Sequence, residues 1–337
     1  MRRRQFLSAA TAAAAAPLLD AINPTGKDPG RLLVTSLENV VHQRPLAHAT
    51  MPAARVREGM FAAKADFQAS RYWQLAERLP ALLTTATAEA DPAVLAELYN
   101  TATHVLIKLE VGGYGWLTAE RALTAARASG DPAVIANVTR NAATLYRRAG
   151  RYDLAEHLAL DAAEQLPVSR PDATTEHLSL YGMLQCNAAY AAAQAGDRSR
   201  ANELLDHADQ AAARLGGDHN AYWTAFGPTN VISHRISAAS ALGDAGTAIA
   251  HAARVPPGAI RIPERLSRYW VDVARAYQQW GKPARCYQAL LIAERHAPEE
   301  VRSRPVVRTL AAELLCAPRQ AGMTGLREFA TRVSVIG

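Results

Sequence analysis

Polar residues recur at one fixed distance from a series of glycines, and their side chains could hydrogen-bond a ligand. The pairs, nine residues apart, are Asn141 with Gly150, Asn187 with Gly196, His234 with Gly243 and Asp272 with Gly281. One helical turn earlier on the same face stand Asn137, Met183, Asn230 and Arg268. An asparagine amide donates and accepts, which suits the backbone of an extended peptide, although asparagine is a poor helix former. We predict that these eight positions contact a ligand; hydrogen bonds to the neighbouring repeat are the alternative.

A second candidate wall for a binding pocket is aromatic. Residues 222–230 read YWTAFGPTN, so Trp223 and Phe226 stand close to Asn230 in the sequence. Aromatic side chains beside a broken helix favour a pocket wall, and the alternative is a packed junction between two repeats. A proline inside a helix costs about 3 kcal/mol or more, whereas the first turn tolerates it. We therefore expect Pro228 to begin a helix if this segment is an ordered entry.

Catalytic chemistry has no recognisable set of residues in this sequence. The histidines show no His-Glu-x-x-His spacing, and no Gly-x-Ser-x-Gly elbow occurs. Residues 111–115 (VGGYG) lack the preceding strand that a phosphate-binding loop needs. Cys186, Cys286 and Cys316 are too few and too far apart for a metal cluster, and each lies in an apolar pattern. We expect a protein that is not an enzyme and uses no metal and no cofactor.

The elements that position these residues are predicted to be helices throughout. Gly and Asp-Pro breaks separate apolar patterns of helical length, and no stretch has a convincing strand pattern. Five residues beyond the four glycines stand the small side chains of Ala155, Ala201, Ala248 and Cys286, which let a second helix close on the first. The sequence predicts an all-α fold, a right-handed superhelical solenoid of antiparallel, tetratricopeptide-like helix pairs over residues 53–316. Two earlier units lack a turn glycine.

Charge and composition exclude some partners. Of the 337 residues 49% are hydrophobic and 20% charged, enough to bury a core. The net charge is +6, but Arg2, Arg3 and Arg4 supply half of it and no later Lys/Arg run could follow a line of phosphates. We therefore expect no direct binding of nucleic acid. Arginine greatly outnumbers lysine, which we attribute to a high-GC genome rather than to phosphate binding.

The N-terminal segment 1–22 resembles a twin-arginine export signal. Arg-Arg-Gln-Phe-Leu is followed by an Ala-rich apolar stretch that ends at Leu19. That stretch is shorter than the roughly 20 residues that span a bilayer, so no stable membrane span is expected. The alternative is a remnant interdomain linker. Residues 23–52 are predicted to be a linker with a short helix, and residues 317–337 a C-terminal tail.

The sequence also resembles one known family over residues 53–316. The stretches that carry the resemblance are 67–69, 71–72, 75–76, 79–80, 119, 121–123, 222–231 (YWTAFGPTNV) and 297–305 (APEEVRSRP). They resemble the C-terminal tetratricopeptide half of Xre-type helix-turn-helix transcriptional regulators of high-GC bacteria. The resemblance implies a sensor of a peptide or small molecule, or a domain that mediates dimerisation. The sequence shows no helix-turn-helix pattern before the repeats, and we expect a departure from the family in that respect.

Two functional hypotheses follow from these observations. In the first, the chain is a cytoplasmic, non-catalytic regulatory module whose concave surface binds a peptide, protein or small-molecule effector, and which forms a homodimer in the manner that the family implies. In the second, it is an exported solenoid-type binding protein, a reading that depends on the first 20 residues alone.

Overall fold

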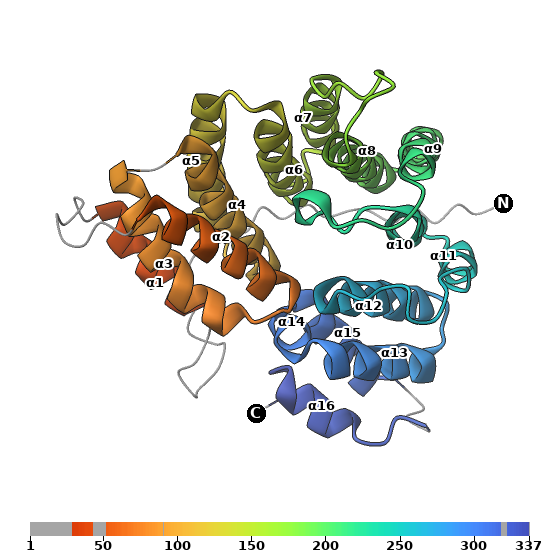
Figure 1. Ribbon diagram of the computed structural model, residues 1–337. Helices are drawn as coiled ribbons and strands as arrows, with labels where there is room; N and C mark the ends of the chain where they lie inside the picture. The colour runs from red at the N-terminus through yellow and green to blue at the C-terminus, as the bar shows by residue number, and fades with distance from the viewer. Residues whose placement is uncertain (1–28, 43–51, 90, 318–321, 337) are drawn as a thin grey trace.

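The structure, a computed structural model, describes residues 29–42, 52–89, 91–317 and 322–336. These residues form sixteen α-helices, a short 3-10 turn and no strand. The predicted all-α fold is confirmed, and consecutive helices pack side by side as a helical-repeat solenoid (Figure 1). The twin-arginine-like segment 1–22 lies outside the described residues.

The first nine helices make up the N-terminal part of the solenoid. They are α1 (Pro29–His42), α2 (Ala53–Gln68), α3 (Tyr72–Glu89), α4 (Pro92–Leu109), α5 (Gly112–Ser129), α6 (Pro132–Arg148), α7 (Tyr152–Glu164), α8 (Thr175–Ala195) and α9 (Arg198–Leu215). Asp91 and Asp131 cap α4 and α6 by accepting hydrogen bonds from the backbone N–H groups of Ala93 and Ala133.

The remaining elements follow a crossing segment at residues 216–227. They are η2 (Ala221–Trp223), α10 (Pro228–Ala241), α11 (Ala245–Ala252), α12 (Pro263–Gln279), α13 (Pro283–His296), α14 (Pro298–Ser303), α15 (Pro305–Leu315) and α16 (Leu326–Arg332). Pro228 is the first residue of α10, so it removes no hydrogen bond from the helix interior. The first-turn placement, the less costly of the two considered for this proline, is the one observed.

The turns within the helix pairs lie where the glycine spacing predicts them. Gly150, Gly196, Gly243 and Gly281 separate α6 from α7, α8 from α9, α10 from α11 and α12 from α13, each with positive φ. In the two earlier pairs the same left-handed position is taken by Ser70 (φ 58°) and Glu110 (φ 56°). Non-glycine residues can take this conformation at some energetic cost, which explains why the sequence showed no clean turn there.

The helical array extends beyond both ends of the predicted 53–316 repeat region. The short helix expected within residues 23–52 is α1, and its Leu33 and Leu37 are fully buried against the neighbouring helices. At the other end α16 packs on α15, and the ring of Phe329 is buried beside Tyr287. Both segments therefore contribute to the folded core.

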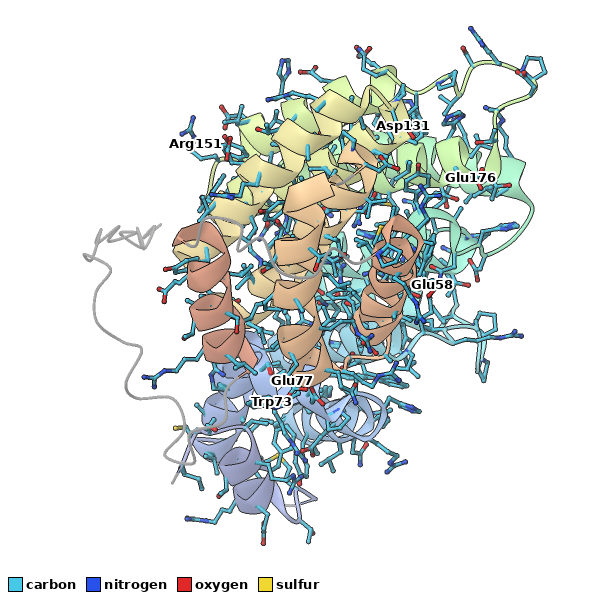
Figure 2. All side chains as sticks on the ribbon, turned by 60° about the vertical axis from the view of Figure 1, so that its left-hand side comes forward. Glu58, Trp73, Glu77, Asp131, Arg151 and Glu176 are labelled. Atoms are coloured by element: carbon cyan, nitrogen blue, oxygen red, sulfur yellow. The ribbon has the colours of Figure 1, made fainter. Side chains whose placement is uncertain are left out.

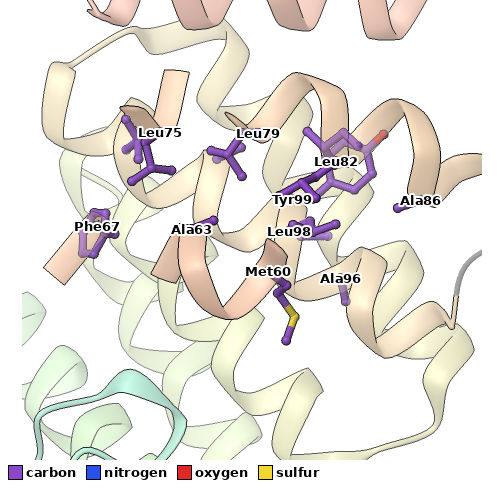
Figure 3. Packing of buried hydrophobic residues seen from close by; sticks show 14 of the residues in the cluster. Met60, Ala63, Phe67, Leu75, Leu79, Leu82, Ala86, Ala96, Leu98 and Tyr99 are labelled. Atoms are coloured by element: carbon purple, nitrogen blue, oxygen red, sulfur yellow. The ribbon is translucent and has the colours of Figure 1, made fainter. Parts of the chain in front are cut away.

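The buried side chains form three main clusters along the solenoid. Figure 3 shows part of the first, where Met60 and Phe67 of α2 meet leucines of α3 such as Leu75 and Leu79. The second cluster is rich in alanine and joins α6–α10, and the third joins α10–α16. Alanine permits close approach of helices, so the second cluster packs through many small contacts rather than a few large ones.

The solenoid curls until its two ends meet, so the helices form a closed ring in Figure 1. Helix α2 contacts α12, and α4 contacts α14. The backbone N–H of Tyr72 donates to Glu299 (2.7 Å), and Lys108 donates to Glu300 (2.8 Å) and to Glu264. We call this junction of Tyr72, Lys108, Glu264, Glu299 and Glu300 the seam. It encloses the concave side of the solenoid.

Candidate ligand-binding chamber

Two adjoining cavities occupy the inside of the ring. The first has a volume of about 520 Å³ and lies against His234 of α10; we call it the His234 lobe. The second, of about 570 Å³, lies between α4, α6, α8 and α12; we call it the arginine lobe. Arg265, Arg268 and Asp272 of α12 line both cavities. Each volume lies within the range of small-molecule sites, roughly 300–1,000 Å³.

The arginine lobe takes its name from its charge. Its cationic lining residues are Lys108, Arg140, Arg147, Arg148, Arg265, Arg268, Arg275 and Arg304, and its carboxylates are Glu110 and Asp272. Charged side chains of both signs cover the outside of the ring, where Figure 2 shows Glu58, Glu77 and Arg151. The charges that line the arginine lobe are therefore mostly positive, unlike the mixed charges outside the ring.

Several of these cations already have partners. Arg265 lies 3.1 Å from Glu264, Arg304 lies 3.3 Å from Glu300, and Arg148 lies 3.0 Å from Glu110. Asp272 is shared, since Arg275 approaches it to 3.5 Å and Arg268 to 3.9 Å. The seam carboxylates thus neutralise part of the lobe, but not all of it.

Arg140 and Arg147 of α6 form no ion pair among the described residues. Arg140 donates to the side-chain oxygen of Asn137 (3.2 Å), and its Nε has no hydrogen-bond partner there. Arg147 donates to Gln194 (2.6 Å) and lies over the ring of Tyr190. Burial lowers the pKa of each guanidinium to about 10, with Arg265 adding to the effect at Arg140. Both side chains therefore hold positive charge at neutral pH with no carboxylate paired directly to them, and an anion would stabilise that charge.

The asparagines predicted to contact a ligand mostly bond to neighbouring repeats instead. Asn137 donates to Glu97 (2.8 and 3.0 Å), Asn141 donates to Asn100 (2.7 Å), and Asn187 donates to the carbonyl oxygen of Arg140 (2.9 Å). Their amide N–H groups are used within the fold, because each helix packs against the first helix of the preceding pair. The alternative hypothesis of inter-repeat bonds accounts for these three residues, although Asn141 and Asn187 also line the arginine lobe.

The other predicted residues divide between the chamber and the core. Asn230 and His234 line the His234 lobe, and Arg268 and Asp272 line both lobes. Met183 is buried in the second core cluster at the edge of the arginine lobe. Four of the predicted positions therefore line the His234 lobe, and their role in binding a ligand stays a prediction.

The aromatic side chains of residues 222–230 mainly pack against other helices and contribute little to a pocket wall. Phe226 is fully buried in the second core cluster, where its ring lies against Gly182 of α8, so its assignment to the pocket wall is corrected. Trp223 is half-buried, lies near Phe61, and lines only a small cavity of about 30 Å³ that also contacts Asn137. Gln68 donates to its carbonyl oxygen (3.2 Å), which ties the segment to α2.

The imidazole of His234 is neutral in the folded protein. Burial lowers its pKa well below the ordinary value, and the positive charges of Arg268, Arg265, Arg147 and Arg140 lower it further. In the unfolded chain the histidine takes up a proton below about pH 6.5, which the folded chain does not. Stability is therefore lost as the pH falls through that range.

We expect His234→Gln to reduce this loss of stability in acid. Between pH 7.5 and 5.5 the wild-type histidine contributes a loss of about 1.4 kcal/mol in the free energy of unfolding, and the variant lacks that contribution. Urea unfolding at the two pH values measures it, with His157→Gln as the control because His157 is exposed. An equal pH dependence in wild type and His234→Gln would contradict the neutral imidazole.

The described part of the chain has neither a metal-binding cluster nor a membrane-spanning helix. No group of three or more His, Cys, Asp or Glu side chains there is arranged to hold a metal ion. No described helix is both long and apolar enough to span a bilayer.

Comparison with known proteins adds little. No protein-family model and no curated protein matches the chain. A solved structure, BtubC (BKLC) from P. vanneervenii, is similar at 17% sequence identity with a TM-score of 0.38, covering 72% of this chain and 90% of that chain. A likeness this weak does not bear on function.

Proposed function

We propose that this chain is a non-catalytic, regulator-like sensor module that encloses an anionic small-molecule effector inside its ring. The observation that carries the proposal is the pair Arg140 and Arg147, two buried or half-buried guanidinium groups that face the arginine lobe without a carboxylate partner among the described residues. A protein that only needed a stable core would be expected to pair or avoid such charges. An anion in the lobe would supply the missing charge.

The concave shape supports a small effector over a folded protein. The seam joins the N-terminal and C-terminal helices, so helices of the same chain surround the chamber around the ring. Ser233, His234 and Asp272 all line the His234 lobe, but no hydrogen bond joins them to one another in the described part of the chain. Ser233 donates to the carbonyl oxygen of Thr229 (3.1 Å), and Asp272 accepts from Ser237 (2.6 Å). Because no base is bonded to a nucleophile, binding rather than turnover is the activity proposed. The resemblance to Xre-type regulators supports a sensory role, with the cytoplasm as the proposed compartment.

The experiment that tests the proposal uses pyrophosphate as a compact anionic probe. Isothermal titration of the full chain should show binding, and the double variant Arg140→Gln, Arg147→Gln should bind at least tenfold more weakly. A hydrogen bond to a charged group contributes about 1.5–3 kcal/mol, so the loss of two such donors exceeds tenfold. The unliganded double variant should unfold at the same temperature or higher, because the substitution removes buried charge that has no partner.

The matched control is Arg127→Gln on α5, which removes an exposed arginine outside the chamber. It should leave pyrophosphate affinity unchanged. Failure of pyrophosphate to bind, or equal affinity of the double variant and wild type, would refute the proposal. A large loss of stability in the unliganded double variant would instead assign Arg140 and Arg147 a structural role.

A further inference from the structure

The His234 lobe contains two buried polar atoms that the proposed anion site does not use. The side-chain oxygen of Asn230 and Nδ1 of His234 have no hydrogen-bond partner in the described part of the chain, and both side chains are at least nine-tenths buried. The two residues are four apart on α10 and face the same cavity. An unsatisfied buried polar atom costs about 1–3 kcal/mol, so a ligand that pairs with them would bind more tightly.

The groups around these atoms favour an uncharged partner. Asn230 can donate and accept, and the neutral imidazole of His234 likewise has one donor and one acceptor nitrogen. The charges on the walls of the lobe are mixed, since Arg261, Arg265 and Arg268 line it together with Asp218 and Asp272. A cation or an anion would each meet charge of its own sign. A neutral group with an adjacent donor and acceptor would not.

The remaining walls suit a flat, partly apolar group. Ile260, Ile262 and the ring of Tyr269 line one side of the lobe, and Ala225 and Ala259 add small apolar surfaces. A carboxamide or a nitrogen heterocycle presents donor and acceptor atoms at its edge and apolar faces above and below. Such a group would meet the polar wall with its edge and the isoleucines with its faces.

The two lobes adjoin, so one molecule can occupy both. Arg265, Arg268 and Asp272 belong to the lining of each, and α12 runs along the boundary between them. We infer that the effector has two parts, an anionic group in the arginine lobe and, covalently attached to it, an uncharged carboxamide or nitrogen heterocycle that pairs with Asn230 and His234. The inference rests on the proposed function, because it takes the anion site as given.

The test compares probes that carry one part or both. Pyrophosphate carries the anion alone, adenosine the heterocycle alone, and ADP both. N-acetylglutamine carries a carboxylate and a primary carboxamide at the end of its side chain. N-acetylnorvaline keeps the carboxylate and the N-acetyl amide and lacks only that primary carboxamide. Titration of the full chain should show a two-part probe binding at least tenfold more tightly than its anion-only counterpart. The ADP pair and the N-acetylglutamine pair together tell a heterocycle from a carboxamide.

The variant Asn230→Leu keeps the size of the side chain and removes its hydrogen-bonding atoms. It should abolish the advantage of the two-part probe and leave pyrophosphate affinity unchanged. Asn202→Leu on α9, an exposed asparagine, is the matched control and should change neither. Ser233→Phe, which fills the lobe from the same helix, is a second variant with the same expected outcome. Circular dichroism melting of each variant checks that it is folded.

The outcomes separate the inference from the proposal on which it rests. If pyrophosphate binds through Arg140 and Arg147 but neither two-part probe binds more tightly, the inference is wrong and the anion site stands. An equal loss of pyrophosphate and ADP affinity in Asn230→Leu also overturns it, because Asn230 would then act on the anion. If no probe binds at millimolar concentration, both are wrong.

Discussion

Lys108→Met should lower the free energy of unfolding by about 3–5 kcal/mol, because it removes the cation that two buried carboxylates share and leaves each with a single arginine, Arg265 or Arg304. Lys108 donates to Glu264 and to Glu300 (2.8 Å), and all three side chains are almost completely buried. Burial alone would raise the pKa of Glu264, but Arg265 and Lys108 outweigh it and hold that pKa below its ordinary value. The carboxylate of Glu264 is thus charged in the folded protein. Removing Lys108, one of its two cationic partners, therefore lowers the stability of the folded state. Urea unfolding monitored by circular dichroism measures the change.

The same substitution should open the ring, since these contacts join α4 to α12 and α14. Small-angle scattering should report a larger radius of gyration for Lys108→Met than for wild type. Lys64→Met is the control, because Lys64 is equally buried and pairs with Glu97 within the N-terminal helices. It should destabilise the protein without opening the seam. A change in unfolding free energy below about 1 kcal/mol for Lys108→Met, or an equal expansion of both variants, would contradict this role of the seam.

The helical framework could be predicted because its signals are local. Each turn glycine lies within one hairpin, and the small residue five positions later, such as Ala155 or Ala201, packs in that same hairpin. The two early turns at Ser70 and Glu110 escaped prediction because a non-glycine residue with positive φ has no distinctive sequence signal. Their conformation is imposed by the packing of the helices on either side.

The chamber could be predicted only in part, because its walls are fixed by contacts distant in sequence. The spacing from the glycines put His234 and Asp272 in equivalent positions of their helix pairs, and both line the His234 lobe. The seam joins Lys108 to Glu300, 192 residues later, and no periodicity reveals such a contact. The arginine excess was attributed to genome composition, although Arg140 and Arg147 are seven apart on one face of α6. This seven-residue spacing is the sequence signal that both arginines lie on the same side of one helix.

Phe226 anchors the crossing segment that forms one wall of the His234 lobe. Its fully buried ring lies against α8, while Ala225 and Asn220 of the same segment line the lobe. The segment is backbone-strained at Tyr222, Trp223 and Ala225, which have positive φ, so it depends on this anchor for its shape. Phe226→Ala should therefore lower the free energy of unfolding by about 3–5 kcal/mol, the usual loss for a buried phenylalanine.

A second substitution, at Gly182, tests whether the ring of Phe226 fills the space that a Cβ atom at Gly182 would need. A Cβ atom added at Gly182 would lie 1.9 Å from Cζ of Phe226, so Gly182→Ala should lower the free energy of unfolding by about 1–3 kcal/mol. In the Phe226→Ala background the clash is gone, and alanine is a better helix former than glycine by roughly 1 kcal/mol. The same substitution should then be stabilising.

The effect of Gly182→Ala on the free energy of unfolding should thus reverse its sign between the two backgrounds. This reversal tests directly whether Phe226 anchors the crossing segment on α8. Urea midpoints of the four proteins in the cycle measure the coupling directly. Gly113→Ala on α5 is the control, since a Cβ there meets nothing within 4 Å, and it should have the same small effect in both backgrounds. If Gly182→Ala destabilises both backgrounds equally, then Phe226 does not pack on Gly182. The crossing segment would then need another anchor, and the shape of the His234 lobe would no longer follow from it.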